Sequence, residues 1–202
     1  MGALNSKILN YTSGILLGAT PQLLAANQKV AKRMRKLSAS EISSQDPRAA
    51  VPLEKVQEYH ENELSRRKAL EDKAKTNVTA VTIAISVLFS GLTVVGNDKI
   101  IATSGAMRSI LICALIFCVA NFVLGGLFAM RTLQAGPLQS LSLNHELLDE
   151  KERVGILLRA IDLNQMDTMI RYNWLSASYH CIKNAVFALS SFVVIVTIHI
   201  LR

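Results

Sequence analysis

The chain has 202 residues, half of them hydrophobic, and charged residues make up 18%, below the roughly 25% that is usual in soluble domains. The apolar residues are gathered in long runs, which indicates transmembrane helices and argues against a soluble globular core. The formal charge of +7 is typical of a membrane protein whose Lys and Arg residues set its topology. The alternative interpretation is that the excess of positive charge binds anionic lipid or nucleic acid.

Residues 1–52 are predicted to be a basic cytoplasmic segment followed by a linker. The apolar run at 8–26 is broken by polar residues, so it is too polar to span a bilayer. Two alternatives for this region are a cleaved signal peptide and myristoylation at Gly2. A basic amphipathic helix follows, with Val30, Met34 and Leu37 on its apolar face. Its basic face is either solvated or contacts lipid headgroups or nucleic acid, and the candidate residues are Lys32, Arg33, Arg35 and Lys36.

Residues 53–76 are predicted to form a charged cytoplasmic helix, either simply solvated or part of an oligomerising stalk. It leads straight into Val78–Gly96, which contains 19 residues without a charge. That length is enough to cross a hydrocarbon core of about 30 Å at 1.5 Å per residue. Because no Pro or Gly interrupts the sequence from Leu53 to Ser90, one helix is expected to run from water into lipid.

A second apolar run, bracketed by Arg108 and Arg131, makes residues 77–130 a transmembrane hairpin. Residues 131–181 are too charged to insert and are expected to form a cytoplasmic helical segment, and residues 182–202 form a third span. The fold class is therefore an all-α integral membrane protein with a hairpin, a cytoplasmic helical segment and a C-terminal transmembrane helix.

Lys and Arg residues gather before the first span and after the second, whereas the loop at 97–108 has only two. The positive-inside rule therefore puts the N-terminus and the 131–182 segment in the cytoplasm, and the loop and Arg202 outside. Tyr172, Trp174 and Tyr179 precede the third span, as an interfacial aromatic group would.

Small hydroxylated residues follow one face of the first span, spaced by three or four. At about 100° per residue they fall within roughly a third of the helix circumference. This hydroxyl stripe begins at Thr76, ends at Asn97 and contains the candidate site residues Thr79, Thr82, Ser86, Ser90 and Thr93. The opposite side carries Val81, Ile85, Val87, Leu88 and Leu92. The stripe either packs against another helix or lines a water-filled pore built from several copies.

Two other polar residues lie within spans: Asn121, near the middle of the second and able to bond across helices, and His199, near the end of the third. The three cysteines have no metal-site spacing and are interpreted as small packing residues. The sequence has no catalytic grouping, no histidine at metal spacing and no phosphate-binding loop, so neither an enzyme nor a cofactor or metal site is expected.

The layout and one local segment resemble a group of small bacterial membrane proteins. The segment SRRKALEDKAKTNVTAVTIAISVLFSGL runs from a charged helix into the hairpin, and its local match lies in Arg66 to Lys75. A helix followed by a last span, RYNWLSASYHCIKNAVFALSSFVVIV, is similar too. In layout, residues 53–202 resemble the SLATT-like effectors and the transmembrane effectors of retron and cyclic-nucleotide anti-phage systems, many of which have two spans where this chain has three.

The resemblance implies a membrane effector, a toxin of a bacterial anti-phage defence system that disrupts the inner membrane and causes abortive infection. Such a protein is multi-pass, forms homo-oligomers in the lipid bilayer and takes no small-molecule substrate. Its partners would be a reverse transcriptase with its DNA or a nucleotide-signalling enzyme. The alternative is a structural or regulatory membrane anchor subunit that recruits a soluble complex.

Overall fold

The computed structural model describes residues 21–39, 47–95, 105–134 and 149–200, and this part of the chain is helical without strands. Its elements are α2 (Pro21–Ala39), the short 3₁₀ helix η1 (Pro47–Ala50), α3 (Leu53–Val95), α5 (Gly105–Leu133) and α6 (Glu150–Ile200). The all-α prediction is confirmed for these residues. Within 1–52, the basic helix and the end of the linker are described, and the remainder lies outside the described residues.

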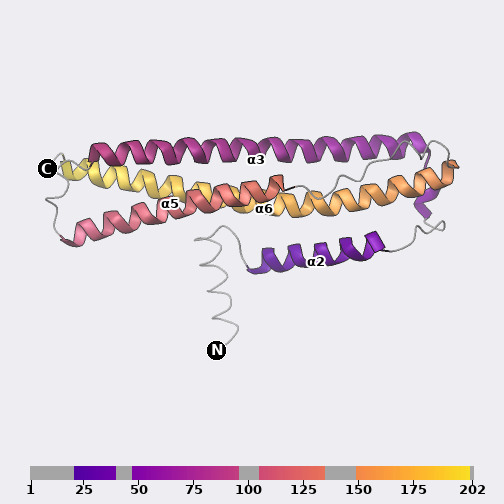
Figure 1. Cartoon of the computed structure of the whole chain (residues 1–202), viewed down its shortest axis with the longest axis horizontal. Helices are drawn as coiled ribbons and strands as arrows, with labels where there is room; N and C mark the ends of the chain where they lie inside the picture. The colour runs from indigo at the N-terminus through magenta and orange to yellow at the C-terminus, as the bar shows by residue number, and fades with distance from the viewer. Residues whose placement is uncertain (1–20, 40–46, 96–104, 135–148, 201–202) are drawn as a thin grey trace, which may run out of the picture.

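Three long helices lie side by side and form an elongated rod, with α2 beside one half of it (Figure 1). α3 and α6 run in the same direction, because Val56 packs against Leu157 near their starts and Asn77 bonds to Ser178 further along. α5 runs the opposite way, since its late residue Thr132 meets Arg171 and its earlier Cys118 meets Ala185. The rod thus has a polar half, made by the first parts of α3 and α6, and an apolar half that includes α5.

Both long helices run through the boundary between these halves without a break. α3 is one helix of 43 residues, which confirms that the charged segment continues into the apolar one. α6 is one helix of 51 residues, so the boundary expected between residues 181 and 182 falls inside a helix. Continuity is physically reasonable, because α6 contains a single glycine, Gly155, and no Pro.

Two helices are long and apolar enough to cross a membrane by length and composition. They are α5 over Ser109–Leu133, with a mean hydropathy of 2.6, and α6 within Glu150–Ile198, with a mean hydropathy of 2.0. The span expected at Val78–Gly96 is helical as far as Val95, and its last residue lies outside the described part. Three membrane passes and their orientation stay predictions.

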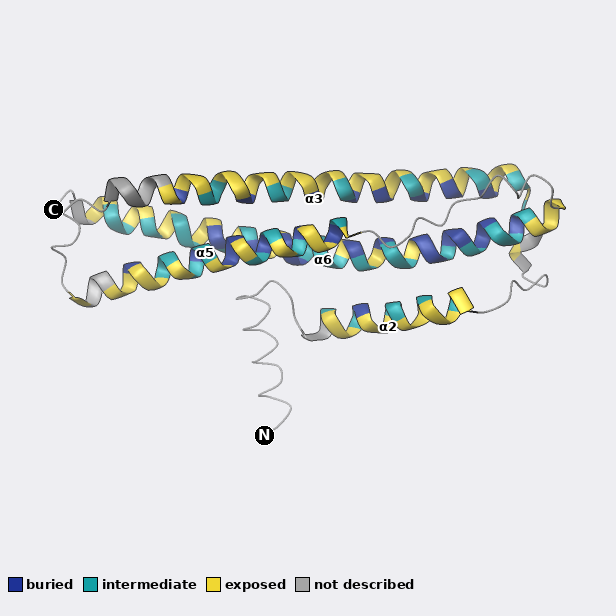
Figure 2. Ribbon diagram, in the orientation of Figure 1, coloured by how far each residue is buried: buried dark blue, intermediate teal, exposed yellow. Residues whose placement is uncertain are grey.

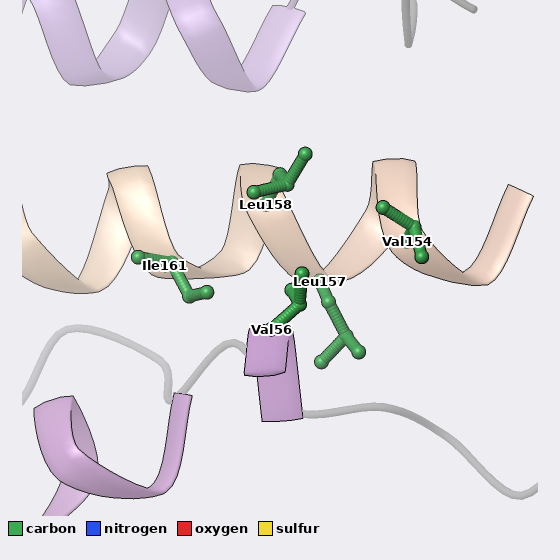
Figure 3. Packing of buried hydrophobic residues seen from close by; sticks show 5 residues of the cluster. All are labelled: Val56, Val154, Leu157, Leu158 and Ile161. Carbon is green, nitrogen blue, oxygen red and sulfur yellow. The ribbon is translucent and has the colours of Figure 1, made fainter. Parts of the chain in front are cut away.

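Each half of the rod has its own hydrophobic core. In the polar half, Val56 of α3 packs among residues of α6, namely Val154, Leu157, Leu158 and Ile161 (Figure 3). In the apolar half, the core is made by Val81, Leu88, Cys118, Phe122 and Ala185. Burying an aliphatic or aromatic side chain of this size contributes about 1.5–3 kcal/mol, so both halves hold α3 against α6.

Adjacent glycines let α5 approach both neighbouring helices. A Cβ on Gly125 would lie 3.0 Å from Cγ1 of Ile182 and 3.3 Å from the carbonyl oxygen of Ser178, both on α6. A Cβ on Gly126 would lie 3.3 Å from Cγ1 of Val81 on α3. The helices therefore pack closely at Gly125 and Gly126, with each glycine facing a different helix.

Candidate functional site

The hydroxyl stripe lies on the outer surface of the rod. Thr79, Thr82 and Ser86 are exposed, and Figure 2 shows that the exposed side of α3 is turned away from α5 and α6. Ser90 and Thr93 belong to the same helix, but their side chains lie outside the described residues. The side chains of Thr79, Thr82 and Ser86 are therefore exposed on the side of α3 that faces away from α5 and α6, whereas Thr76, at the start of the stripe, borders a groove between α3 and α6.

The hydroxyl groups donate their protons within their own helix. Thr79 bonds to the carbonyl of Lys75 at 3.1 Å, Thr82 to that of Val78 at 2.9 Å, and Ser86 to that of Thr82 at 2.9 Å. Such bonds satisfy the hydroxyl donors even in lipid. The oxygen lone pairs remain on the outer surface, where they can accept a hydrogen bond from water or from a second helix.

The side of α3 opposite the stripe makes the internal contacts. Val81 and Leu88 are buried, and Ile85 packs against the same core, as the sequence predicts. Val87 was expected on that side but is 63% exposed, because it lies a quarter turn from the buried row. Val87 and Phe89 flank the stripe at about 80° on either side and are 63% and 59% exposed, so large apolar side chains border the stripe.

The basic face of α2 is exposed along the helix. Its candidate residues Lys32, Arg33, Arg35 and Lys36 all face outward. The opposite, apolar face is partly buried against α6. Asn173 of α6 donates a hydrogen bond to Asn27 at 2.7 Å. Arg159 of α6 donates to the carbonyls of Leu37 and Ser38 at 3.0 and 2.7 Å. The helix is thus fixed on the polar half of the rod with its positive charges displayed.

A buried ionic cluster, absent from the expectations drawn from sequence, joins the three long helices where the polar half meets the apolar half. Arg171 of α6 is 2% exposed. Its Nε donates to Asp167 at 2.5 Å, and its Nη1 donates to Glu71 of α3 at 3.0 Å and to the carbonyl of Thr132 of α5 at 2.8 Å. One guanidinium therefore connects all three helices.

A second buried arginine completes the cluster. Arg67 donates from Nε to Oε1 of Glu71 at 3.3 Å, and its Nη1 lies 3.6 Å from Oδ2 of Asp167. The two arginines and two carboxylates alternate, so their charges cancel. Removing one partner from such an arrangement leaves an uncompensated buried charge, which costs far more than an exposed pair is worth.

The cluster changes the interpretation of the charged helix. Arg67 pairs with Glu71, which also faces Arg171 of the neighbouring helix. Lys75 pairs with Asp72 at 3.3 Å on the exposed side of the same helix. Both arginines have a carboxylate four residues away in their own helix, which was the sequence signal available for this cluster.

The other polar residues singled out in the spans play smaller roles. Asn121 is buried and donates to the carbonyl of Phe117 at 3.0 Å in its own helix, so the expected bond across helices is absent among the described residues. The side chain of His199 lies outside the described part. Cys118 and Cys181 are buried, as expected of packing residues, whereas Cys113 is exposed because it faces outward from α5.

His60 is buried on α3 in the polar half. Desolvation lowers its pKa below the ordinary value, and the nearby Glu61 opposes that shift. Its Nδ1 has no hydrogen-bond partner among the described residues. In the described part of the chain, no group of three His, Cys, Asp or Glu residues is arranged to hold a metal ion.

Comparisons with known proteins found no match: no family model, no curated protein and no solved structure is similar to this chain.

Proposed function

We propose that this chain is a multi-pass protein of the bacterial inner membrane that forms homo-oligomers and permeabilises the membrane. The apolar half of the rod enters the bilayer, and the polar half stays in the cytoplasm. In the oligomer, the hydroxyl stripe of α3 faces the conducting path. The activity is physical rather than enzymatic, and it needs no cofactor, metal or small-molecule substrate.

The position of the hydroxyl stripe is the observation that carries this proposal. A polar row in an apolar helix is ordinarily used to pack neighbouring helices closely. Here Thr79, Thr82 and Ser86 face outward, while the packing inside the protomer uses Val81 and Leu88 on the other side. The row is therefore available to a second copy or to water.

The apolar surface of the rod supports insertion into lipid. Exposed large apolar side chains of the described residues gather on the apolar half, among them Ile83 on α3, Ile116 on α5 and Phe187 on α6. Only 28% of the apolar window of α5 and 11% of that of α6 is buried. A soluble core helix would be mostly buried, whereas helices in a bilayer present their apolar sides to the acyl chains.

Abortive infection in an anti-phage defence system is the biological role we propose, on the strength of the resemblance to SLATT-like, retron and cyclic-nucleotide effectors. Partner proteins, a reverse transcriptase with its DNA or a nucleotide-signalling enzyme, hold such an effector silent until infection. The exposed basic face of α2 is a suitable surface for an anionic partner of this kind.

Expression in bacteria without partners tests the pore. Wild type should collapse the membrane potential, measured with a potential-sensitive dye while membrane-fraction protein is quantified. Ser86→Leu fills the stripe with an apolar side chain and should preserve the potential at unchanged protein level. Thr82→Val keeps the shape of the side chain but removes the hydroxyl. It should reduce the collapse of the membrane potential less than Ser86→Leu does.

Ala80→Leu is the matched control, because Ala80 is exposed on the same helix but lies roughly 120° from Ser86. It should remain as active as wild type. Loss of the protein rather than of the activity in Ser86→Leu would mean that the stripe packs helices. An intact membrane potential during strong wild-type expression would exclude the pore and favour the anchor subunit.

A specific observation favours that alternative. The polar half is fixed rigidly to the spans by the ionic cluster, and α2 displays its positive charges along it. A rigid cytoplasmic projection of this kind also suits a subunit that recruits a soluble, negatively charged complex to the membrane. Co-purification of such a complex with an inactive Ser86→Leu variant would support this function.

A further inference from the structure

A groove of about 600 Å³ opens at the boundary between the two halves, where the start of α2 meets the end of α5 and the middle of α6. Its volume is within the range of about 300–1,000 Å³ that is typical of ligand sites. Its lining includes Leu24, Leu124, Leu127, Phe128, Arg131 and Trp174. Neither the hydroxyl stripe nor the ionic cluster faces it, so it is a separate feature.

The lining changes from apolar to polar along α5. Leu124 and Leu127 lie toward the apolar half, whereas Arg131 and Gln134 lie at the cytoplasmic end of the groove. A phospholipid in the inner leaflet has the same order, with acyl chains toward the membrane centre and phosphate toward the cytoplasm. The groove therefore matches a lipid in polarity and in direction.

Among the described residues, the polar groups at the cytoplasmic end of the groove have hydrogen-bonding capacity that is not used. Arg131 lies over the ring of Trp174 at 5.4 Å and has no hydrogen bond or ion pair within the described part of the chain. Trp174 stacks on Phe128 with ring centroids 5.5 Å apart, and its indole N–H likewise has no acceptor among the described residues. A guanidinium binds phosphate in two-pronged geometry, and an indole N–H suits an ester carbonyl.

From these observations, and resting on the membrane insertion proposed above, we infer that the groove is a binding site for one anionic phospholipid. Arg131 binds the phosphate, Trp174 lies at the level of the ester groups, and one acyl chain lies against Leu124, Leu127 and Leu24. Because α2 contributes Leu24, the lipid joins the basic helix to the spans.

The single tryptophan of the chain is Trp174, so its fluorescence reports this groove alone. The full-length chain in detergent micelles is titrated with phosphatidylglycerol brominated on one acyl chain, and separately with brominated phosphatidylcholine. Phosphatidylglycerol should quench Trp174 saturably and half-maximally at a roughly tenfold lower mole fraction. Both lipids carry the phosphate, but in phosphatidylcholine the choline cation cancels its charge and repels the guanidinium of Arg131.

Arg131→Gln should reduce that preference to about twofold or less, since it removes the charged contact while leaving the apolar wall. Comparing the two lipids within each variant cancels the change in fluorescence that loss of the stacked guanidinium causes by itself. Lys73→Gln is the control: Lys73 lines a different groove, about 350 Å³, between α3 and α6, and its loss should leave the preference intact.

Two outcomes would overturn the lipid site. If Trp174 is shielded from both lipids, a protein segment from this chain or a second copy fills the groove. If both lipids quench equally and only at high mole fraction, Trp174 is at a micelle surface without a site, and the membrane insertion stands. Release of the chain from membranes by alkaline carbonate without detergent would instead contradict the insertion itself.

Discussion

Arg171 of α6 donates from Nη1 to Oε1 of Glu71 on α3 at 3.0 Å, although the two residues are 100 positions apart in the chain. The same nitrogen donates to the carbonyl of Thr132 near the end of α5. The bond lies where charged sequence gives way to apolar sequence in both α3 and α6. If the polar half moves relative to the apolar half, this contact must either break or move as a unit with Arg171, Glu71 and Thr132.

Arg171→Met is expected to lower the free energy of unfolding by about 2–3 kcal/mol, because it leaves the partly buried carboxylates of Glu71 and Asp167 with one arginine between them. Urea unfolding of the detergent-solubilised chain, followed by circular dichroism, measures this. Lys75→Gln breaks an exposed pair and should change stability by less than about 1 kcal/mol. Equal stability of the two variants would show that the cluster contributes little.

Gly125→Ala should be destabilising by about 1–3 kcal/mol, since the new Cβ meets Ile182 and the backbone of α6. In Gly126→Ala the new Cβ meets the side chain of Val81 alone, with Cγ1 at 3.3 Å and no backbone atom, and the change should cost less. In Gly105→Ala the new Cβ has nothing within 4 Å, and because Gly105 is the first residue of α5, stability should change by less than about 0.5 kcal/mol. Thermal unfolding in detergent ranks the three, and the reverse order would contradict the close approach of α5 to α6.

Burial lowers the pKa of His60 in the folded chain, with Glu61 opposing. Between the ordinary value near 6.5 and the lower folded value, the unfolded state binds more protons, so stability falls as pH drops through this window. His60→Gln should make the urea midpoint less sensitive to pH between about 7 and 5. His180→Gln, at an exposed histidine, controls for loss of an imidazole and should retain the wild-type pH dependence.

Replacing Lys32, Arg33, Arg35 and Lys36 of α2 together by Gln should weaken association with an anionic partner and reduce its salt dependence. Each lost phosphate contact lowers the slope of log affinity against log salt by roughly 0.7–0.9. Binding to vesicles containing phosphatidylglycerol, and to single-stranded DNA, measures this at several salt concentrations. An equal loss of charge at Lys55, Lys68, Lys73 and Lys75 of α3 should change the slope less, and identical slopes would remove the basic face as a specific contact.

Parallel α3 and α6 put Leu53 and Glu150 at the same end of the rod, so both ends should lie on one side of the membrane. With the Lys and Arg distribution, that side is the cytoplasm and the C-terminus is outside. Alkaline phosphatase fused after Arg202 should be active, and green fluorescent protein fused there should be dark. The opposite pattern would reverse the orientation.

The helical elements were predictable because their signals are local. An uninterrupted sequence from Leu53 to Ser90 indicated the single helix α3, and the charge-free runs indicated the apolar half. The faces of α2 and α3 were also largely predictable, since 100° per residue places Val30, Met34 and Leu37 together, and Thr79 opposite Val81. Val87 shows the limit of this reasoning, because periodicity fixes an angle but not which part of the circumference a neighbour covers.

The cluster around Arg171 was not predictable, because it depends on which helices become neighbours and in what register. The sequence alone determined the helices, their apolar and polar faces and the charge excess, all of which follow from backbone geometry and side-chain hydrophobicity along one segment. Only the tertiary structure decided that Arg67 and Arg171 are buried together, that Gly125 and Gly126 serve different neighbours, and that Trp174 and Arg131 share a groove. Contacts between residues 100 positions apart are set by the packing of whole helix faces, which no local spacing encodes.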